Sequence, residues 1–440
     1  MKIILFIVAL IFSLPSLKAQ TEEDGRIAQS LNTSDWFELK RVYDKADKEK
    51  LMPMLRVFAE SMIASQFNQP EKATIAIREL MNTYGNEIGV ANMLGMGFLL
   101  ASNEAKQGKY ADAARTLSNI ITAFEPHTDS TSLVLHREYE QQYRILAQYQ
   151  GVNQIASTAE EDYHIPFRLD SIGPIDKRAL TIMIPAEVNQ QRQDIVFDSG
   201  AGVNIVSTKA AERLGLDQYV TPTQVTGVST QNGTLAVAKE MQLGNLTLKN
   251  VPFYVVDISS GVDSIDAYLS HLDMIIGVKF IQTMKEVQID FEKNEFILPH
   301  QLSSLQANET SNMAEGTSGL FVIEGKGNGE RLLFNFDTGA GSSTLDKKYY
   351  ELHKEYLTTH CKVDTLRSAG TGGIRIEQAY ILPHFSLEIN GTSHTFPQIL
   401  VATKGSEVDL NYGNLGMDYF LNFKKIIFNT KKMFVRLINE

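Results

Sequence analysis

Two aspartates occupy near-identical loops, each directly after an apolar run. Asp198 begins the sequence Asp-Ser-Gly-Ala-Gly, and Asp337 begins Asp-Thr-Gly-Ala-Gly. A glycine beside a strand end lets the backbone turn tightly, so that the carboxylate is presented at a rigid position. Two such carboxylates about 3 Å apart cannot both ionise cheaply, and they share one proton. The pair could therefore act as base and acid on one water molecule and hydrolyse a peptide bond.

The segments that carry these loops repeat along the chain. The offset from Asp198 to Gly277 is identical to the offset from Asp337 to Gly416. Each of these glycines follows apolar residues and precedes an aromatic residue, and a charged hairpin between two short strands comes next. Several motifs in the same order at matched offsets indicate duplication, because chance rarely supplies more than one in register. The sequence therefore predicts two tandem β lobes.

At these residues the chain resembles the aspartic proteases, and in particular the retropepsin-like group. The resemblance covers about residues 163–440 and implies the acid-protease fold, with Asp198 and Asp337 as the catalytic dyad. In retropepsins two identical chains supply one aspartate each, whereas here one chain would supply both. The family implies that the hydroxyl residues of the loops hydrogen-bond across the lobe interface and that the glycines allow this approach. The supporting residues would be Ser199, Gly200, Ala201, Thr338, Gly339 and Ala340.

The same family has hairpin flaps that close over the substrate. Each lobe offers a glycine-bearing candidate tip, Gly227 in lobe 1 and Gly370 in lobe 2, at a similar offset after its aspartate. Glycine suits a mobile tip. Neither candidate carries the tyrosine that pepsin-like enzymes place there, which favours the retropepsin comparison. Ordinary surface hairpins are the alternative interpretation.

Ala201 and Ala340 differ from the pepsin-like pattern, in which a hydroxyl residue usually follows Asp-Thr-Gly and hydrogen-bonds the carboxylate. An alanine side chain cannot donate this bond, and loss of a donor to the charged form raises the pKa of a carboxylate. We therefore expect an activity optimum less acidic than that of pepsin, between about pH 4.5 and 7.

Hydrophobic periodicity divides the chain into parts of different class. Upstream of the lobes, apolar residues recur at three and four positions, as in Leu51, Leu55, Phe58 and Met62, which predicts helices. Two helical segments share a turn followed by small residues and resemble a tetratricopeptide-type repeat; a plain helical bundle is the alternative. Short alternating strands follow, so the fold class is multidomain, α plus all-β. The predicted parts are a helical domain at 20–160, lobe 1 at 161–300, a polar linker at 301–316 and lobe 2 at 317–440.

The segment 1–19 has the pattern of a signal peptide. A lysine at position 2 is followed by an apolar run and by a small-residue end near Ala19. A retained anchor is the alternative, but the apolar run is shorter than the ~20 residues that span a bilayer. We therefore expect an exported protein, periplasmic or extracellular, without stable membrane insertion after cleavage. A single cysteine, Cys361, is typical of a bacterial rather than an animal secreted protein.

These features favour an exported aspartic endopeptidase, and the alternative is a non-catalytic protein that binds peptides or a partner on the same scaffold. A net charge of −11 disfavours nucleic-acid binding. The run Gly325–Gly329 lies between strands rather than before a helix, so it predicts a hairpin turn and not a dinucleotide loop. We expect no cofactor and no metal site. The expected partners are peptide or protein substrates, with a protein partner of the helical domain as a further candidate. The helical domain could recruit substrate, inhibit the cleft as a pro-segment or mediate assembly; we favour recruitment, because its repeats would offer a concave peptide-binding face.

Overall fold

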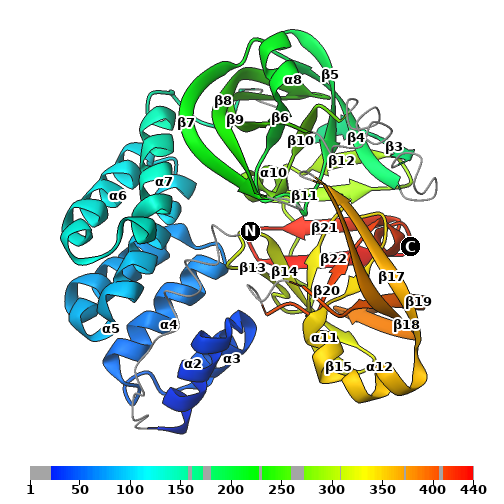
Figure 1. Cartoon of the computed structure of the whole chain (residues 1–440), viewed down its shortest axis with the longest axis horizontal. Helices are drawn as coiled ribbons and strands as arrows, with labels where there is room; N and C mark the ends of the chain where they lie inside the picture. The colour runs from blue at the N-terminus through cyan, green and yellow to red at the C-terminus, as the bar shows by residue number, and fades with distance from the viewer. Residues whose placement is uncertain are drawn as a thin grey trace. The chain divides into compact units, whose positions relative to one another are not determined.

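A computed structural model describes residues 21–156, 161–171, 180–226, 230–258, 272–307, 309–370, 373–405 and 410–439. These residues form two compact units. The first contains the described residues up to 152, with 314–319 and 410, and the second contains those of 153–313, 320–405 and 411–439. The first unit is helical and the second is built from strands (Figure 1). The predicted class, α followed by all-β, is therefore confirmed.

The helical unit begins with a capping box. The side chain of Thr21 accepts a hydrogen bond from the backbone of Asp24, and the Asp24 carboxylate accepts one from the Thr21 backbone. Pro53 and Pro70 each occupy a first helical position, where a missing N–H costs nothing. The helices are α2 (Glu22–Thr33), α3 (Trp36–Lys45), α4 (Pro53–Gln66), α5 (Pro70–Lys106), α6 (Tyr110–Phe124) and α7 (Val134–Leu146).

Consecutive helices of this unit pack against each other, α4 on α5, α5 on α6 and α6 on α7. Gly97 of α5 lies so close to Ile120 of α6 that a Cβ atom there would be 2.6 Å from the isoleucine side chain. Helix α5 is kinked at Gly89, whose φ of 78° is accessible to glycine at little cost. The helical prediction is confirmed, and the tetratricopeptide-like repeat stays a prediction. Among the described residues no helix combines the length and the apolar character needed to span a membrane.

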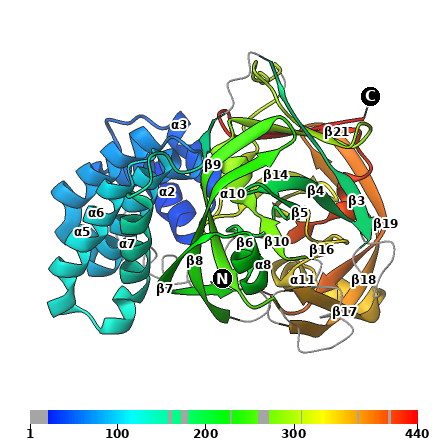
Figure 2. The same ribbon diagram turned by 90° about the horizontal axis from the view of Figure 1, so that it is seen from above.

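The first lobe is one sheet that closes on itself. Its strands are β1 (Gln154–Ile155), β3 (Arg168–Ser171), β4 (Leu180–Val188), β5 (Gln191–Phe197), β6 (Ile205–Ser207), β7 (Asp217–Thr226), β8 (Thr230–Leu243), β9 (Leu246–Val256) and β10 (Met274–Ile276). They pair in the order β1-β9-β6-β10-β5-β4-β8-β7, β3 pairs with β4, and an additional β8–β9 pairing closes the sheet. Strand β10 lies between β5, to which it is parallel, and β6, to which it is antiparallel (Figure 2).

The second lobe repeats this topology. Its strands are β14 (Phe321–Gly327), β15 (Glu330–Phe336), β16 (Thr344–Leu345), β17 (Lys362–Gly370), β18 (Gly373–Ile389), β19 (Thr392–Ala402) and β20 (Gly413–Leu415). Strand β20 lies between β15, parallel to it, and β16, antiparallel to it, and β16 is parallel to β19 as β6 is to β9. The predicted duplication is therefore confirmed at the level of strand order.

Tight turns join matching hairpins of the two lobes. Asn189 and Gln190 connect β4 to β5, and Asn328 and Gly329 connect β14 to β15. All four have positive φ, as a two-residue turn of type I′ requires. The hairpin predicted at Gly325–Gly329 is thus confirmed. Short helices complete the lobes: α8 (Thr208–Arg213), α10 (Val278–Thr283), α11 (Lys347–Leu352), α12 (Lys354–His360) and α13 (Met417–Phe420).

The charged hairpins that follow each lobe's second glycine motif form a sheet shared by both lobes. Its strands are β2 (Tyr163–Pro166), β11 (Glu286–Asp290), β12 (Glu295–Leu298), β21 (Lys425–Asn429) and β22 (Phe434–Ile438). They pair in the order β2-β12-β11-β21-β22, so that β11 of lobe 1 lies beside β21 of lobe 2 (Figure 1). Within the predicted linker, Met313–Glu315 forms a short strand, β13.

Candidate active site

The two aspartates emerge from equivalent strand ends. Asp198 follows β5, and its backbone N–H donates to the carbonyl of Ile276 at 3.0 Å. Asp337 follows β15, and its N–H donates to the carbonyl of Leu415 at 2.9 Å. In each lobe the last strand residue faces an apolar partner in parallel register, Phe197 opposite Ile276 in lobe 1. The buried strands therefore fix the point at which each carboxylate leaves the sheet.

Reciprocal hydrogen bonds join the loops of the two lobes. The Ser199 N–H donates to Thr338 Oγ1 and the Thr338 N–H donates to Ser199 Oγ, both at 3.0 Å. Each hydroxyl donates in turn to a carbonyl of the other lobe, Ser199 to Phe336 at 2.9 Å and Thr338 to Phe197 at 3.0 Å. Ser199 is 2% exposed and Thr338 is fully buried. These four bonds are shielded from water and set the distance between the loops.

The glycines of the two loops bring each carboxylate against the opposite loop. A Cβ atom at Gly200 would lie 2.4 Å from Cγ of Asp337, and one at Gly339 would lie 2.4 Å from Cγ of Asp198. No side chain fits at this distance, so both positions require glycine. The structure thus brings Asp198 and Asp337, from opposite lobes, into one site.

Burial and mutual repulsion act on the paired carboxyls. Loss of solvation, followed by the negative charge of Asp337, raises the pKa of Asp198 from 3.8 to about 8. Backbone N–H groups of Gly200 and Ala201 lower this pKa, but they do not outweigh the two larger causes. Burial and the neighbouring charge therefore favour the protonated form of Asp198. Such a site can hold one proton between two carboxyls, as acid–base hydrolysis requires.

The donors around the two carboxyls differ. Asp198 Oδ1 accepts a bond from the Gly200 N–H at 2.8 Å. Asp337 Oδ1 accepts bonds from the N–H groups of Gly339 and Ala340, both at 3.0 Å, and Asp337 Oδ2 accepts one from Asn414 Nδ2 at 2.8 Å. Asn414 is not among the site residues predicted from the sequence. The signal was present, because Asn414 occupies an element whose counterpart in lobe 1 is wholly apolar, Ile275-Ile276-Gly277.

The alanines of the loops act through their backbones. The Ala201 carbonyl accepts from the Val278 N–H at 2.9 Å, and the Ala340 carbonyl accepts from the Met417 N–H at 2.8 Å, so each loop is tied to the glycine motif behind it. As expected from their side chains, neither alanine donates a side-chain hydrogen bond to a carboxylate. The donor that Ala340 lacks comes instead from Asn414, on strand β20.

Only one of the two flap candidates lies among the described residues. Gly227 falls outside the described residues, between β7 and β8. Gly370 ends β17 and pairs with Gly373 of β18. Among the described residues β7 pairs with β8 up to Thr226 and Thr230, and the function of either candidate as a flap stays a prediction.

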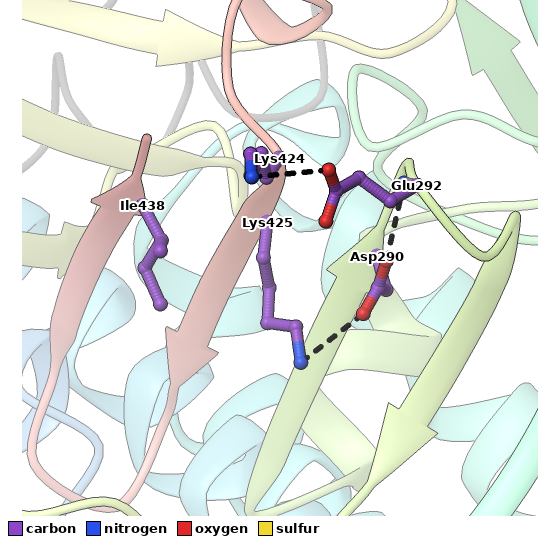
Figure 3. Close-up of a pocket in the computed structure, with 5 residues that line it drawn as sticks. All are labelled: Asp290, Glu292, Lys424, Lys425 and Ile438. Atoms are coloured by element: carbon purple, nitrogen blue, oxygen red, sulfur yellow. Dashed lines mark hydrogen bonds and ion pairs between the residues drawn. The ribbon is translucent and has the colours of Figure 1, made fainter. Parts of the chain in front are cut away.

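A small cavity on the shared sheet is separate from the paired loops. It is lined by Asp290, Glu292, Lys424, Lys425 and Ile438 (Figure 3). Lys424 pairs with Glu292 and Lys425 pairs with Asp290, each at 3.2 Å. The four charged groups neutralise one another across the β11–β21 junction. This cavity therefore belongs to the joint between the lobes.

Removal of the Thr338 hydroxyl tests the joint between the loops. Thr338→Val keeps the shape of the side chain but leaves the Ser199 N–H and the Phe197 carbonyl unpaired and buried. We expect the free energy of unfolding of the β unit to fall by about 2–6 kcal/mol, because each of the two unpaired groups costs about 1–3 kcal/mol. Thr338→Ser keeps the hydroxyl and should cost only about 1 kcal/mol. Scanning calorimetry distinguishes the two variants, and equal losses would show that the hydroxyl bonds are not what stabilises the joint.

Comparison with known proteins gives a family match in lobe 1. A family model described as aspartyl protease matches residues 184–280, a segment that contains both the Asp198 loop and the Gly277 motif. No curated protein matches the sequence. A crystal structure of a retropepsin-like aspartic protease from Rickettsia conorii is similar to this chain at 18% identity, covering 32% of this chain and 96% of that one, with a TM-score of 0.22. The family match thus identifies an aspartyl protease segment in lobe 1, and lobe 2 repeats the loop and strand order of that segment.

Proposed function

We propose that this protein is an exported aspartic endopeptidase, which hydrolyses peptide bonds with a water molecule activated by Asp198 and Asp337. One observation carries the proposal. Two carboxyls from two repeated loops of one chain are held against each other by the reciprocal bonds of Ser199 and Thr338. The fold does not need this arrangement for its stability, because burial of a charged pair of carboxyls costs solvation free energy.

The chemistry needs one ionised and one protonated carboxyl. The ionised member removes a proton from water as the water oxygen attacks the peptide carbonyl carbon, and the protonated member gives its proton to the carbonyl oxygen. The tetrahedral diol then collapses. The first carboxyl passes its new proton to the amide nitrogen, the C–N bond breaks, and one hydroxyl proton of the diol returns to the second carboxyl. One water is consumed, and the dyad ends with the single proton it began with.

The pH dependence follows from the protonation of Asp198. Because its pKa is raised to about 8, the singly protonated dyad should persist through neutral pH and be lost as the pH rises through about 8. We therefore expect kcat/KM to fall on the alkaline side near pH 8 and to have its maximum well above that of pepsin. Initial rates between pH 3 and 9 measure this profile. A maximum below pH 3 would contradict the assignment.

A peptide-library digest tests the activity itself. Wild-type protein should cleave within peptides, and a statine inhibitor, which mimics the tetrahedral diol, should block this cleavage. Asp198→Asn serves as the negative control, because it separates cleavage by the dyad from cleavage by a contaminant. The contrary outcome is that, between pH 3 and 8, no cleavage is found that is both blocked by the inhibitor and lost in Asp198→Asn. The protein is then better described as a peptide-binding scaffold.

Export and substrate recruitment complete the proposal. The N-terminal sequence pattern supports export, and N-terminal sequencing of the protein recovered outside the cytoplasm would locate the cleavage near Ala19. The packed helices α4 to α7 support recruitment of protein substrates by the helical unit. Unchanged activity on protein substrates after removal of residues 21–150 would contradict recruitment.

A further inference from the structure

The two halves of the dyad are nearly equivalent, and Asn414 breaks that equivalence. Its Nδ2 donates to Oδ2 of Asp337 at 2.8 Å. In the parallel pair β15–β20, Asn414 lies opposite Asn335, whereas in the matching pair β5–β10 the same places hold Ile275 and Val196. A pair of amides in lobe 2 therefore stands where lobe 1 has a pair of apolar side chains.

The fold does not require these amides. Lobe 1 builds the same strand pair with a valine and an isoleucine, both of which pack without polar groups. In lobe 2 the Oδ1 atom of Asn335 is buried with no hydrogen-bond partner in the described part of the chain, and an unpaired buried acceptor destabilises a strand pair. The reason for an amide at position 414 is therefore to be sought in its contact with the carboxyl of Asp337.

We infer that Asn414 is a positioning residue that makes Asp337 the ionised member of the dyad and leaves the shared proton on Asp198. An N–H group binds a carboxylate more strongly than a neutral carboxyl. Asp337 accepts three such bonds, from Gly339, Ala340 and Asn414, and only the last comes from a side chain. The proton of two otherwise equivalent carboxyls moves to the member with fewer donors, which is Asp198.

The charged surroundings of Asp337 agree with this assignment. Among the described residues of lobe 1, Asp198 faces it, and the pKa of Asp198 is raised by burial and by the charge of Asp337. Behind the Gly416 motif, Asp418 accepts bonds from the backbone and hydroxyl of Ser343, and His394 lies near enough to act on it electrostatically. None of these interactions supplies Asp337 with a cation. The neutral amide of Asn414 is thus the side-chain donor that distinguishes the two carboxyls.

The inference gives each aspartate one role in the hydrolysis. The kinetic consequence of the inference rests on the proposed function. Asp337 would remove the proton from water, and Asp198 would give its proton to the carbonyl oxygen. With the donor in place, loss of the first dyad proton becomes easier. Loss of the second proton, from Asp198, is little affected, because Asp337 is charged and hydrogen-bonded both before and after that step.

The test replaces Asn414 with the residue that lobe 1 has at the same place. In Asn414→Ile we expect the acid limb of the kcat/KM profile to move up by about one to two pH units, from the loss of one bond to a charged group, and the alkaline limb to stay in place. Asn414→Leu, which has nearly the shape of asparagine, should give the same shift and guards against misfolding of the isoleucine variant. If both limbs move together, or if neither moves, the inference is wrong.

Two further variants complete the design. Asn335→Val removes the neighbouring amide without breaking the bond to Asp337, so its acid limb should stay with that of wild type. The double variant Ile275→Asn with Asn414→Ile moves the donor to lobe 1. It should restore the acid limb and make Asp198 the ionised member. A double variant that keeps the profile of Asn414→Ile alone would contradict the role of the donor.

A measurement that needs no activity separates this inference from the proposed function. Carbon-13 NMR of the aspartate carboxyl groups follows the two dyad protons directly in wild type and in Asn414→Ile. If wild type cleaves nothing but the first titration step moves up in the variant, the peptidase proposal fails and the inference stands. If wild type is an active peptidase and the first step does not move, the inference fails alone.

Discussion

Asp198→Asn is expected to lower kcat/KM for peptide hydrolysis by about 10⁴-fold or more. An asparagine can neither hold the shared proton for transfer nor regain it from the diol, and loss of acid and base participation removes about 10²–10⁴ each. Asp337→Asn should be impaired to a similar extent, because it removes the group that takes the proton from water. Single-turnover cleavage of one library-derived peptide at pH 6 measures both variants.

The stability of Asp198→Asn provides the control for that loss. Because the pKa of Asp198 is about 8 in the folded protein, against an ordinary value of 3.8, the folded protein keeps a proton that the unfolded chain releases. Wild type should therefore lose stability as the pH rises from about 4 towards 8, and it should do so more steeply than the variant, which has no proton to release. At pH 7 the variant should melt no lower than wild type. An inactive variant that melts well below wild type would show that its inactivity comes from unfolding.

Gly339→Ala is expected to disable the site by steric conflict. The added Cβ would lie 2.4 Å from Cγ of Asp198, which is closer than nonbonded carbon atoms approach. The carboxyl or the loop must move, and a displacement of about 1 Å can cost about 10²-fold in rate. Overpacking should also lower the free energy of unfolding by about 1–3 kcal/mol. Gly200→Ala should behave in the same way, because Gly200 has the equivalent contact with Asp337.

A glycine with room beside it is the matched control. At Gly405 an added Cβ would meet Lys347 at 3.5 Å, an ordinary contact, and the backbone there does not need positive φ. Gly405→Ala should change activity little and stability by less than about 0.5 kcal/mol. If Gly339→Ala retained wild-type activity and melting temperature, the close approach of the two loops would be wrong.

The fold could be predicted from the sequence because its signals are short local motifs and because each motif occurs twice. Runs such as Ile195-Val196-Phe197 before Asp198 predict a buried strand, and the repeat of that motif at Asp337 predicts a second lobe. The identical offsets to Gly277 and Gly416 predict that the same strand lies behind each loop. In the structure these are β10 and β20, each parallel to the strand that delivers an aspartate.

The details of the site depended on contacts between residues far apart in sequence. Asn414 reaches Asp337 across 77 residues. Comparison of the two repeats singles out Asn414 as a polar residue, but it does not indicate which group Asn414 binds. Likewise the two charged hairpins were recognised as a repeat, but the pairing of β11 with β21 depends on how the lobes meet. Periodicity reports which face of a strand is buried, whereas the identity of a polar partner is decided by the assembled structure.

The presence of both lobes in one chain has a consequence for the orientation in which a peptide can bind. In an assembly of two identical subunits every substitution appears twice, so the two ends of its site are alike and a peptide can lie in either orientation. Here the half that carries Asn414 differs from the half that carries Ile275. A peptide laid across the two aspartates would then have one orientation that places its carbonyl oxygen toward Asp198. Gene duplication would thus have converted a symmetric binding site into one that distinguishes the N-terminal from the C-terminal side of the bond it cuts.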